Sequence, residues 1–324
     1  MNKVFIDGSA GTTGLRIYER LKERKDIELI ILSEEKRKDT EARKEAFAKA
    51  DIAFLCLPDA AAIEAVGLID NDKTVVIDTS TAHRTAPGWV YGMPELTGQK
   101  EKIKTAKRIA NPGCHASGFI ALVAPLVQAG ILPKDAMLNA FSLTGYSGGG
   151  KKMIAEYEGE EVPALYDAPR QYGLTQKHKH LPEMQIVSGL SEAPCFCPIV
   201  ADFYSGMEVT VPIFASQLQN VAGAVSPIEA IGQVYKAYYG TKGDDAETEH
   251  TGCIYFEGNA DESGFLSAAA MSGSDEMQIS VQGNDERILL VSRFDNLGKG
   301  ASGAAIQNMN IVLGVAEKEG LVTN

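Results

Sequence analysis

The sequence predicts an α/β protein of two domains, in which a doubly wound parallel sheet precedes a domain with a mixed or antiparallel sheet. The chain has 324 residues, and a single hydrophobic core stops growing at roughly 250–300 residues. Through the first hundred residues, short β-branched runs alternate with helical stretches, as they do in βαβ units. Past residue 150 the alternation ends and strand patterns cluster, which indicates a second domain of a different kind.

The alternating part of the chain opens with a strand pattern, and helical patterns separate the strands that follow. The expected strands cover residues 3–6, 27–32, 52–57 and 74–77, and the expected helices cover residues 13–23, 42–48 and 60–69. Parallel strands require crossover connections, which are usually helices. This order of elements therefore predicts a parallel sheet with helices on both faces.

A glycine-rich turn joins the first strand to the first helix. It reads Asp7-Gly-Ser-Ala-Gly-Thr-Thr-Gly14, and its glycines let the backbone approach a pyrophosphate at the helix N-terminus. The spacing differs from the standard G-x-G-x-x-G, so a tight strand–helix connection without a ligand is the alternative. The position of the turn favours a Rossmann-type dinucleotide site. The expected contacts are Gly8, Ser9, Gly11, Thr12, Thr13 and Gly14.

The end of the second strand should decide which dinucleotide binds. An acidic residue there accepts the ribose 2′-hydroxyl of NAD, whereas a basic residue suits the 2′-phosphate of NADP. The segment from Ser33 to Lys38 offers both kinds of residue, and a solvated charged loop is the alternative. We favour NADP, bound through Ser33, Lys36 and Arg37.

The second half of the chain carries fewer helical patterns. Strands are expected at residues 207–213, 253–256, 278–281 and 288–293. One helix is well marked, because Ser226 is a typical N-cap, Pro227 suits the first helical position and Glu229 completes a capping box. A last helix is expected from residue 301 to about residue 319.

Composition excludes several functional classes. The formal net charge of −12 argues against a surface that neutralises nucleic-acid phosphates. No signal-peptide pattern opens the chain, and no stretch approaches the ~18 apolar residues that span a bilayer. We therefore expect a cytoplasmic protein with no nucleic-acid partner and no membrane role.

Five cysteines, an odd and sparse set, indicate a reducing compartment rather than a disulfide framework. Cys195 and Cys197 form a C-x-C pair without a second pair of ligands, so buried thiols are expected there in preference to a metal site. Cys56 and Cys253 lie in strand-like runs and should be inert core thiols. No metal is expected.

Cys114 is the best candidate for a nucleophile. It follows the turn Asn111-Pro-Gly and precedes the apolar stretch 119–128, which should be helical on either side of Pro125. A helix N-terminus carries partial positive charge and unsatisfied N–H groups, which stabilise a thiolate and can donate to an oxyanion. A nucleophile is favoured, and an inert core thiol is the alternative.

The acid–base partner of such a thiolate should be a histidine. His178 and His180 lie two residues apart in a polar, turn-prone segment, with Glu183 near enough to orient one of them. A metal half-site or an exposed loop would give the same pattern. His115 is adjacent to Cys114, but consecutive helical residues diverge by about 100°, so its side chain is expected to point elsewhere.

These motifs resemble the N-acetyl-gamma-glutamyl-phosphate reductase family of arginine biosynthesis, in its compact form, over most of the chain. The resemblance rests on the glycine turn and on Asp78-Thr-Ser-Thr-Ala-His-Arg84, Val90-Tyr-Gly-Met-Pro-Glu-Leu96, Asn111-Pro-Gly-Cys114, His178-Lys-His-Leu-Pro-Glu183 and Asp295-Asn-Leu-Gly-Lys-Gly-Ala-Ser-Gly303. Cys114 and the last segment are also similar to aspartate-semialdehyde dehydrogenase. The H-x-H-x-P-E and Tyr-Gly-Met-Pro-Glu segments favour the acetylglutamyl enzyme. The chain departs from the family pattern in the Thr and His residues of its 78–84 segment and in one extra glycine within 145–150.

The resemblance implies a Rossmann-type domain at residues 1–113, completed by the C-terminal helix 297–324, and a catalytic domain at 114–296 like that of glyceraldehyde-3-phosphate dehydrogenase. It also implies NADP as the cofactor, Asn296 as a cofactor contact and a homo-oligomer, either a dimer or a tetramer. The implied reaction is reduction of an acyl phosphate to an aldehyde through a thioester on Cys114. His180 would move the proton, and His178 and Glu183 would orient it or bind substrate.

Four further residues are expected to bind the small-molecule substrate. Asn111 is a candidate for the oxyanion, and Arg84, Arg170 and Lys151 are candidates for the phosphate or the carboxylate. Aspartate-semialdehyde dehydrogenase and a reductase of carrier-bound aminoadipyl phosphate are alternatives of the same class. A nucleotide-sensing module with inert cysteines is the alternative from a different class.

Overall fold

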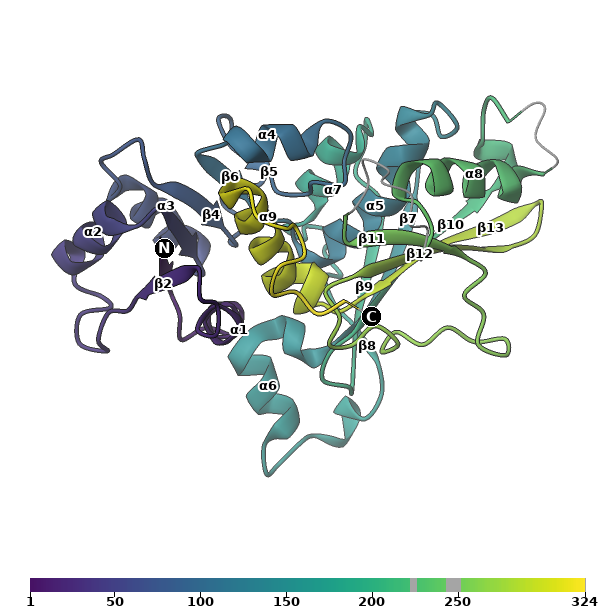
Figure 1. Ribbon diagram of the computed structural model, residues 1–324. Coiled ribbons are helices and arrows are strands. Elements are labelled where there is room, and N and C mark those ends of the chain that lie inside the picture. Colours follow the sequence, from purple (N-terminus) through teal and green to yellow (C-terminus); the bar gives the residue numbers. More distant parts are fainter. Residues whose placement is uncertain (222–225, 243–251, 324) are drawn as a thin grey trace. The chain divides into compact units, whose positions relative to one another are not determined.

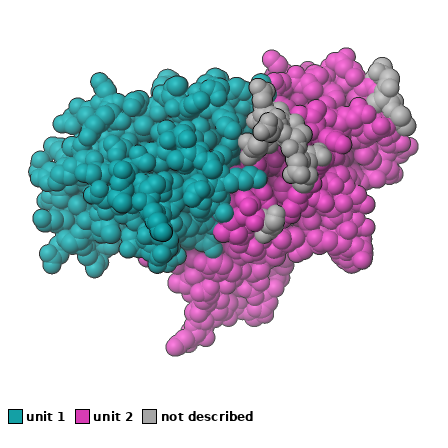
Figure 2. All heavy atoms as spheres, viewed as in Figure 1, with its two compact units in different colours: residues 1–113, 301–321 teal, residues 114–300, 322–324 magenta. Residues whose placement is uncertain are grey.

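The computed structural model describes residues 1–221, 226–242 and 252–323, and the chain divides into two compact units (Figure 2). Unit 1 comprises residues 1–113 and 301–321, and unit 2 comprises residues 114–300 and 322–324. The last part of the chain therefore returns to the unit formed by the first part.

The elements of unit 1 alternate between strand and helix as the sequence predicts (Figure 1). They are β1 (Asn2–Asp7), α1 (Thr12–Leu21), β2 (Ile27–Ile30), α2 (Thr40–Lys49), β3 (Ile52–Leu55), α3 (Asp59–Gly67), β4 (Val75–Asp78), β5 (Val90–Tyr91), α4 (Gln99–Thr105), β6 (Arg108–Ala110) and α9 (Gly303–Leu313). In this unit, described throughout, six parallel strands pair in the order β2-β1-β3-β4-β6-β5. The predicted parallel sheet is confirmed.

Both faces of this sheet are covered, which is why its strands are apolar on both sides. Val4 and Ile6 of β1 point to one face, where they join a core with Ile17 of α1 and Ile306 of α9. Phe5 points to the opposite face and packs with residues of α2 and α3. Burial on both faces is the physical reason for the short continuous apolar runs in the sequence.

Unit 2 is built on a mixed sheet, as predicted. Its elements are α5 (Cys114–Gln128), β7 (Asn139–Gly145), α6 (Gly150–Glu158), β8 (Arg170–Gln171), α7 (Leu181–Ser188), β9 (Cys195–Ala201), β10 (Met207–Phe214), α8 (Pro227–Tyr239), β11 (Ile254–Gly258), β12 (Met277–Gly283) and β13 (Arg287–Phe294). Short 3₁₀ turns cover Tyr146–Gly149, Ala164–Tyr166 and Ala215–Gln217, and a π-helical turn covers Gly298–Ser302. Among the described residues, seven strands pair in the order β11-β12-β13-β10-β7-β9-β8.

Helices α5 and α8 of unit 2 can be compared directly with the sequence predictions. Helix α5 runs without a break through Pro125. Proline has no N–H to donate to the carbonyl oxygen of Ala121 four residues earlier, and that oxygen accepts instead from the Tyr239 hydroxyl at 2.9 Å. Helix α8 begins as predicted, with the Ser226 side chain accepting a hydrogen bond from the backbone N–H of Glu229 at 3.3 Å.

The final helix, α9 of unit 1, is shorter than predicted. It ends at Leu313 because Gly314 adopts the left-handed conformation typical of a helix C-cap, with φ of 68°.

Candidate active site

A pocket of about 580 Å³ lies in unit 1, at the carboxyl ends of β1, β2 and β3. Its lining residues are Phe5, Ile6, Asp7, Gly8, Ser9, Ala10, Gly11, Leu15, Tyr18, Leu29, Ile30, Ile31, Leu32, Arg37, Lys38, Cys56 and Leu57. The carboxyl edge of a doubly wound sheet is the usual place for a nucleotide. The pocket is mostly apolar, with polar groups at the glycine turn and at Arg37 and Lys38.

The glycine turn has a backbone that other residues could not adopt. Gly8 has φ of +89°, and a Cβ there would collide with the carbonyl oxygen of Cys56. A Cβ on Gly14 would collide with the carbonyl oxygen of Gly8, so the first turn of α1 lies directly on the loop. Gly11 provides no side-chain cap for α1. The backbone N–H groups of Thr12 and Thr13 thus lie at the N-terminus of α1, where phosphate oxygens can accept hydrogen bonds from such groups.

Of the three residues expected to bind the 2′-phosphate, one lines the pocket. Arg37 lines it, together with Lys38, which sequence reasoning did not select. Arg37 also pairs with Glu34 at 2.8 Å on the exposed surface. Ser33 and Lys36 are absent from the pocket lining in this fully described unit, although the Ser33 carbonyl accepts from the backbone N–H groups of Lys36 and Arg37 and so shapes the turn.

Asp7 is a buried carboxylate in the wall of this pocket. Burial raises its pKa, and the hydrogen bond and charge of Arg43 oppose that rise. Arg43 donates to it through Nη2 at 2.8 Å and through Nε at 3.1 Å. This pairing offsets negative charge beside the place where an anionic cofactor would bind.

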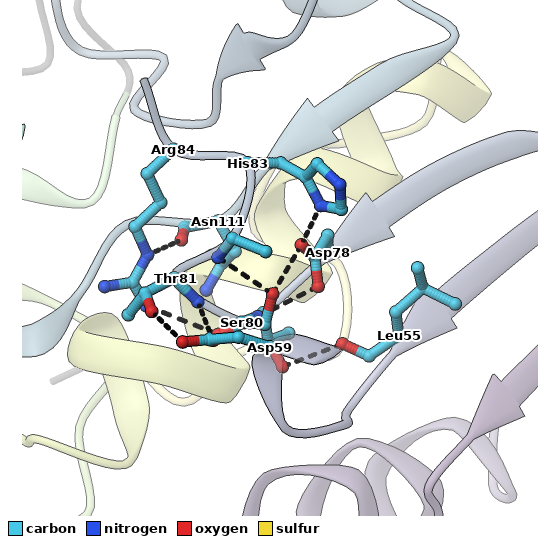
Figure 3. A network of polar contacts seen from close by, with 10 residues as sticks. Leu55, Asp59, Asp78, Ser80, Thr81, His83, Arg84 and Asn111 are labelled. Carbon is cyan, nitrogen blue, oxygen red and sulfur yellow. Dashed lines mark hydrogen bonds and ion pairs between the residues drawn. The ribbon is translucent and has the colours of Figure 1, made fainter. Parts of the chain in front are cut away.

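The segment after β4 holds Arg84 in a dense polar network (Figure 3). The buried carboxylate of Asp78 accepts from the Ser80 hydroxyl at 2.7 Å and lies 2.6 Å from Nδ1 of His83. Arg84 donates through Nε to the carbonyl oxygen of Asn111 at 3.0 Å and through Nη2 to the carbonyl oxygen of Thr79 at 3.3 Å. Arg84 is therefore fixed in direction, and its substrate role stays a prediction.

Asn111 is buried in unit 1 and its amide is already engaged. Its Nδ2 donates to the carbonyl oxygen of Ala301 at 3.0 Å, and its Oδ1 accepts from Nδ2 of Asn308 at 3.4 Å. These bonds tie the end of β6 to the chain that leads into α9. The proposed oxyanion role of Asn111 remains a prediction.

In unit 2, Cys114 is the first residue of α5 and is partly buried. Pro112 and Gly113, which precede it, are not helical, so the thiol lies at the positive end of a helix of 15 residues. This is the position that the sequence predicted, and it suits a reactive thiolate.

The two predicted histidines meet at the start of α7. Their rings lie 4.7 Å apart between centroids and are nearly perpendicular, at 87°. Nδ1 of His178 accepts from the backbone N–H of His180 at 3.2 Å. Nε2 of His180 lies 4.0 Å from Oε1 of Glu183, which is 1% exposed. The segment is therefore an ordered turn that ends in a helix, and it brings the predicted acid–base residues together.

His115, which was expected to diverge from Cys114, lies in the histidine cluster. Its ring lies 5.7 Å from that of His178 and 5.5 Å from that of His180. Its Nδ1 is 2.7 Å from the Ser142 hydroxyl, and its Nε2 is 2.7 Å from the Tyr172 hydroxyl. Burial, and then the charge of His178, lower the pKa of His115 to about 3. Divergence from Cys114 along the helix turns this ring towards the histidine cluster rather than away from it.

The remaining predicted residues of unit 2 lie in different settings. Arg170 donates to the Tyr157 hydroxyl at 2.8 Å, and its guanidinium lies 3.4 Å from the centre of the Tyr166 ring. Lys151 is exposed on α6. Asn296 is buried: its Oδ1 accepts from the N–H of Gly206 at 2.8 Å, and its Nδ2 donates to Ser147 at 3.0 Å. No sequence signal pointed to the tyrosines around Arg170.

The other cysteines follow expectation only in part. Cys253 is buried, as predicted. Cys56 follows β3 and lines the nucleotide pocket of unit 1, where burial raises the pKa of its thiol to about 12. The expectation of buried thiols at Cys195 and Cys197 is wrong, because Cys195 is exposed and Cys197 is partly buried. Alternation along β9 places both on the outward-facing side of the strand.

Comparison with known proteins decides the family. Residues 3–106 match the family described as semialdehyde dehydrogenase, NAD binding domain, and residues 114–296 match semialdehyde dehydrogenase, dimerisation domain. A protein of Nostoc sp. named N-acetyl-gamma-glutamyl-phosphate reductase 2 is 46% identical over 326 residues, covering 98% of this chain and 99% of its own length. This chain belongs to the N-acetyl-gamma-glutamyl-phosphate reductase family. A Pseudomonas putida member is 44% identical over 322 residues, or 98% of each chain.

Solved structures show the same fold as this reductase-family chain at low sequence identity. An aspartate semialdehyde dehydrogenase from Francisella tularensis has a TM-score of 0.69 at 14% identity, over 97% of this chain and 100% of its own. The Candida albicans enzyme, solved with NADP, has a TM-score of 0.64 at 12% identity, over 96% of this chain and 99% of its own. The family match also makes unit 1 an NAD-type binding domain. Among the described residues, no helix is both long and apolar enough to cross a membrane.

Proposed function

We propose that this chain reduces N-acetyl-gamma-glutamyl phosphate to N-acetyl-L-glutamate 5-semialdehyde with NADPH, a step of arginine biosynthesis. The observation that carries the proposal is Cys114 at the N-terminus of α5, in the same unit as the His178–His180–Glu183 cluster, in a chain 46% identical to a named reductase of this kind. The turn at Gly8 and Gly14, where the backbone leaves no room for a Cβ atom, and the adjoining pocket fit a dinucleotide. Arg37 and Lys38 at that pocket support NADP over NAD.

The chemistry assigned to the chain's own residues begins at Cys114. Its thiolate attacks the acyl carbon, the bond to the phosphate oxygen breaks, and phosphate leaves a thioester on Sγ. The nicotinamide cofactor, when bound, supplies the hydride that reduction requires. His180 moves the proton as the aldehyde is released and the thiolate is regenerated, and Glu183 and His178 hold its ring in place. Asn111 and the backbone N–H groups at Cys114 would bind the oxyanion.

Substrate anions and assembly complete the proposal. Arg84, Arg170 and Lys151 would bind the phosphate or the carboxylate, and Asn296 together with Ser33 and Lys36 would extend the cofactor contacts. The family matched by residues 114–296 is described as a dimerisation domain, which supports a homo-oligomer, either a dimer or a tetramer. None of the five cysteines, all of which lie in the described residues, forms a disulfide, which suits a cytoplasmic enzyme.

A substrate comparison tests this function. The reaction runs in reverse as a phosphate-dependent reduction of NADP by the aldehyde, and the rate with N-acetylglutamate semialdehyde is measured beside that with aspartate semialdehyde. We expect turnover with the acetylated compound and far less with the shorter, free-amine compound. Preference for aspartate semialdehyde would assign the chain to the other enzyme of this fold, and no turnover of either aldehyde would favour a nucleotide-sensing role.

A further inference from the structure

We infer that Tyr157 and Tyr166 are positioning residues for Arg170, and that the guanidinium they hold binds the α-carboxylate of the substrate rather than its phosphate. The motifs of the sequence marked neither tyrosine. The inference rests on the proposed function, because it assigns one of the two substrate anions to one of the cations named there.

Aromatic rings fix the plane of the Arg170 guanidinium. Its central carbon lies 3.4 Å from the centre of the Tyr166 ring, in cation–π contact, and its Nη2 donates to the Tyr157 hydroxyl at 2.8 Å. Tyr157 is only 7% exposed, and its ring stacks on that of Tyr146 at 4.7 Å between centroids and 10° between planes. Because one face and one edge of the guanidinium are held by rings that are themselves packed, it loses little further freedom when it binds an anion.

Arg170 has no carboxylate partner in the part of the chain that the structure describes. Its partners there are the two tyrosines, and its Nε is buried without an acceptor. The chain nevertheless carries 43 acidic residues against 31 basic ones. Arginine normally pairs with carboxylate or phosphate through two parallel N–H groups. An arginine that is held in place without an acidic partner, in an acidic chain, is therefore suited to an anion that comes from outside.

The pairing of β8 places Arg170 on the side of the sheet that carries the histidine cluster. Arg170 is the first residue of β8, and the backbone N–H of Tyr172 continues the pairing with β9. Side chains alternate along a strand, so those of Arg170 and Tyr172 lie on the same side, with their Cα atoms roughly 7 Å apart. The Tyr172 hydroxyl is 2.7 Å from Nε2 of His115, which directly follows Cys114. Arg170 is therefore one strand repeat from a residue that contacts the histidine cluster.

The two anions of the substrate differ in what they require of a cation. The phosphate is bonded to the acyl carbon that Cys114 attacks, so its cation must lie beside the thiolate, and the phosphate departs during the reaction. The α-carboxylate is separated from that carbon by the length of the glutamyl chain, and it keeps its charge and its place through every step. A guanidinium that is held rigidly, one strand repeat from Tyr172, suits the carboxylate.

The reverse reaction tests this assignment, because it takes the two anions as separate substrates. The KM for N-acetylglutamate semialdehyde and the KM for inorganic phosphate are measured in the full-length wild type and in the variants. Tyr166→Leu should raise the KM for the aldehyde about tenfold, as expected for a lost cation–π contact at a desolvated site, and leave the KM for phosphate unchanged. Tyr166→Phe keeps the ring and should resemble the wild type. Tyr157→Phe, which removes the acceptor of Nη2, should raise the KM for the aldehyde severalfold, and Arg170→Gln should raise it at least as far as Tyr166→Leu does.

A double variant shows whether Tyr166 acts through Arg170. Adding Tyr166→Leu to Arg170→Gln should change neither KM further, because the ring then has no guanidinium to hold. With the decarboxylated analogue of the aldehyde, Tyr166→Leu and the wild type should have the same KM. Tyr238→Leu is the matched control, because Tyr238 is also partly buried but lies on α8, where its hydroxyl bonds to Gln128.

An unchanged KM for the aldehyde in folded Tyr166→Leu would overturn the inference, and so would additive effects in the double variant. A rise in the KM for phosphate instead would assign Arg170 to the phosphate and refute the carboxylate site. Each of these outcomes would leave the proposed function standing. A wild type that does not turn over the acetylated aldehyde would overturn the proposed function, and this inference with it.

Discussion

The buried neutral imidazole of His115 should make unit 2 sensitive to mild acid. Its pKa is about 3 in the folded protein, against 6.5 as the ordinary value. Between these values the unfolded chain binds a proton that the folded chain does not, so stability is present above pH 6.5 and is lost as the pH falls towards 3. From pH 7 to pH 5 this one group should remove about 2 kcal/mol from the free energy of unfolding.

Urea unfolding of the wild type and of His115→Gln, each at pH 7 and at pH 5, isolates this contribution. Glutamine does not titrate, so the variant should lose about 2 kcal/mol less over the same interval, whatever its stability at pH 7. Pulse labelling of the buried thiol of Cys253 reports unit 2, whereas emission from Trp89, the single tryptophan, reports unit 1. Equal losses in the two proteins would show that His115 is not held neutral by burial, and the reasoning above would fail.

Three further predictions concern the reaction and its cofactor. Cys114→Ser should abolish reduction while NADPH affinity, measured by titration, stays unchanged, because the thiol is needed only for the acyl-enzyme; substantial residual turnover would contradict the covalent mechanism. His180→Asn should lower kcat by at least roughly 10²-fold and by more than His178→Asn does; the reverse order in steady-state kinetics would exchange their roles. Replacing Lys36 and Arg37 together with alanine should weaken NADPH binding more than NADH binding, and equal binding of both cofactors before and after the change would assign the choice to the neighbouring acidic residues.

Local features of the sequence determined the fold of unit 1 and the position of the nucleophile. Short apolar runs that alternate with helical patterns predict parallel strands and crossover helices. Each kind of element buries its apolar residues with its own spacing along the chain, and that spacing can be seen in the sequence. The turn at Gly8 requires a residue without Cβ, and Cys114 follows a Pro-Gly turn directly. These signals act over a few residues, so one sequence is enough to show them. The cap at Ser226 is of the same kind.

Strands β7 and β9 of unit 2 escaped prediction for a physical reason. Pro198 lies inside β9, and proline is unusual within a strand because it lacks a backbone N–H. The strand is held instead by its parallel partner β7, whose residues lie more than fifty positions earlier in the chain. The expectation of buried thiols at Cys195 and Cys197 also failed because of this long-range pairing. The register of β9 against β7 decides which side of the strand faces outwards, and Cys195 lies on that side.

Only the tertiary structure could bring the acid–base cluster together. Ser142 and Tyr172 lie 27 and 57 residues beyond His115, and no period along the chain relates them. Likewise, α9 is buried on most of its surface, so its sequence does not say which sheet it covers. The structure places Ile306 and Met309 in the core of unit 1. Long-range packing decides such contacts because they depend on where separate elements meet, whereas the sequence specifies directly only what each element favours by itself.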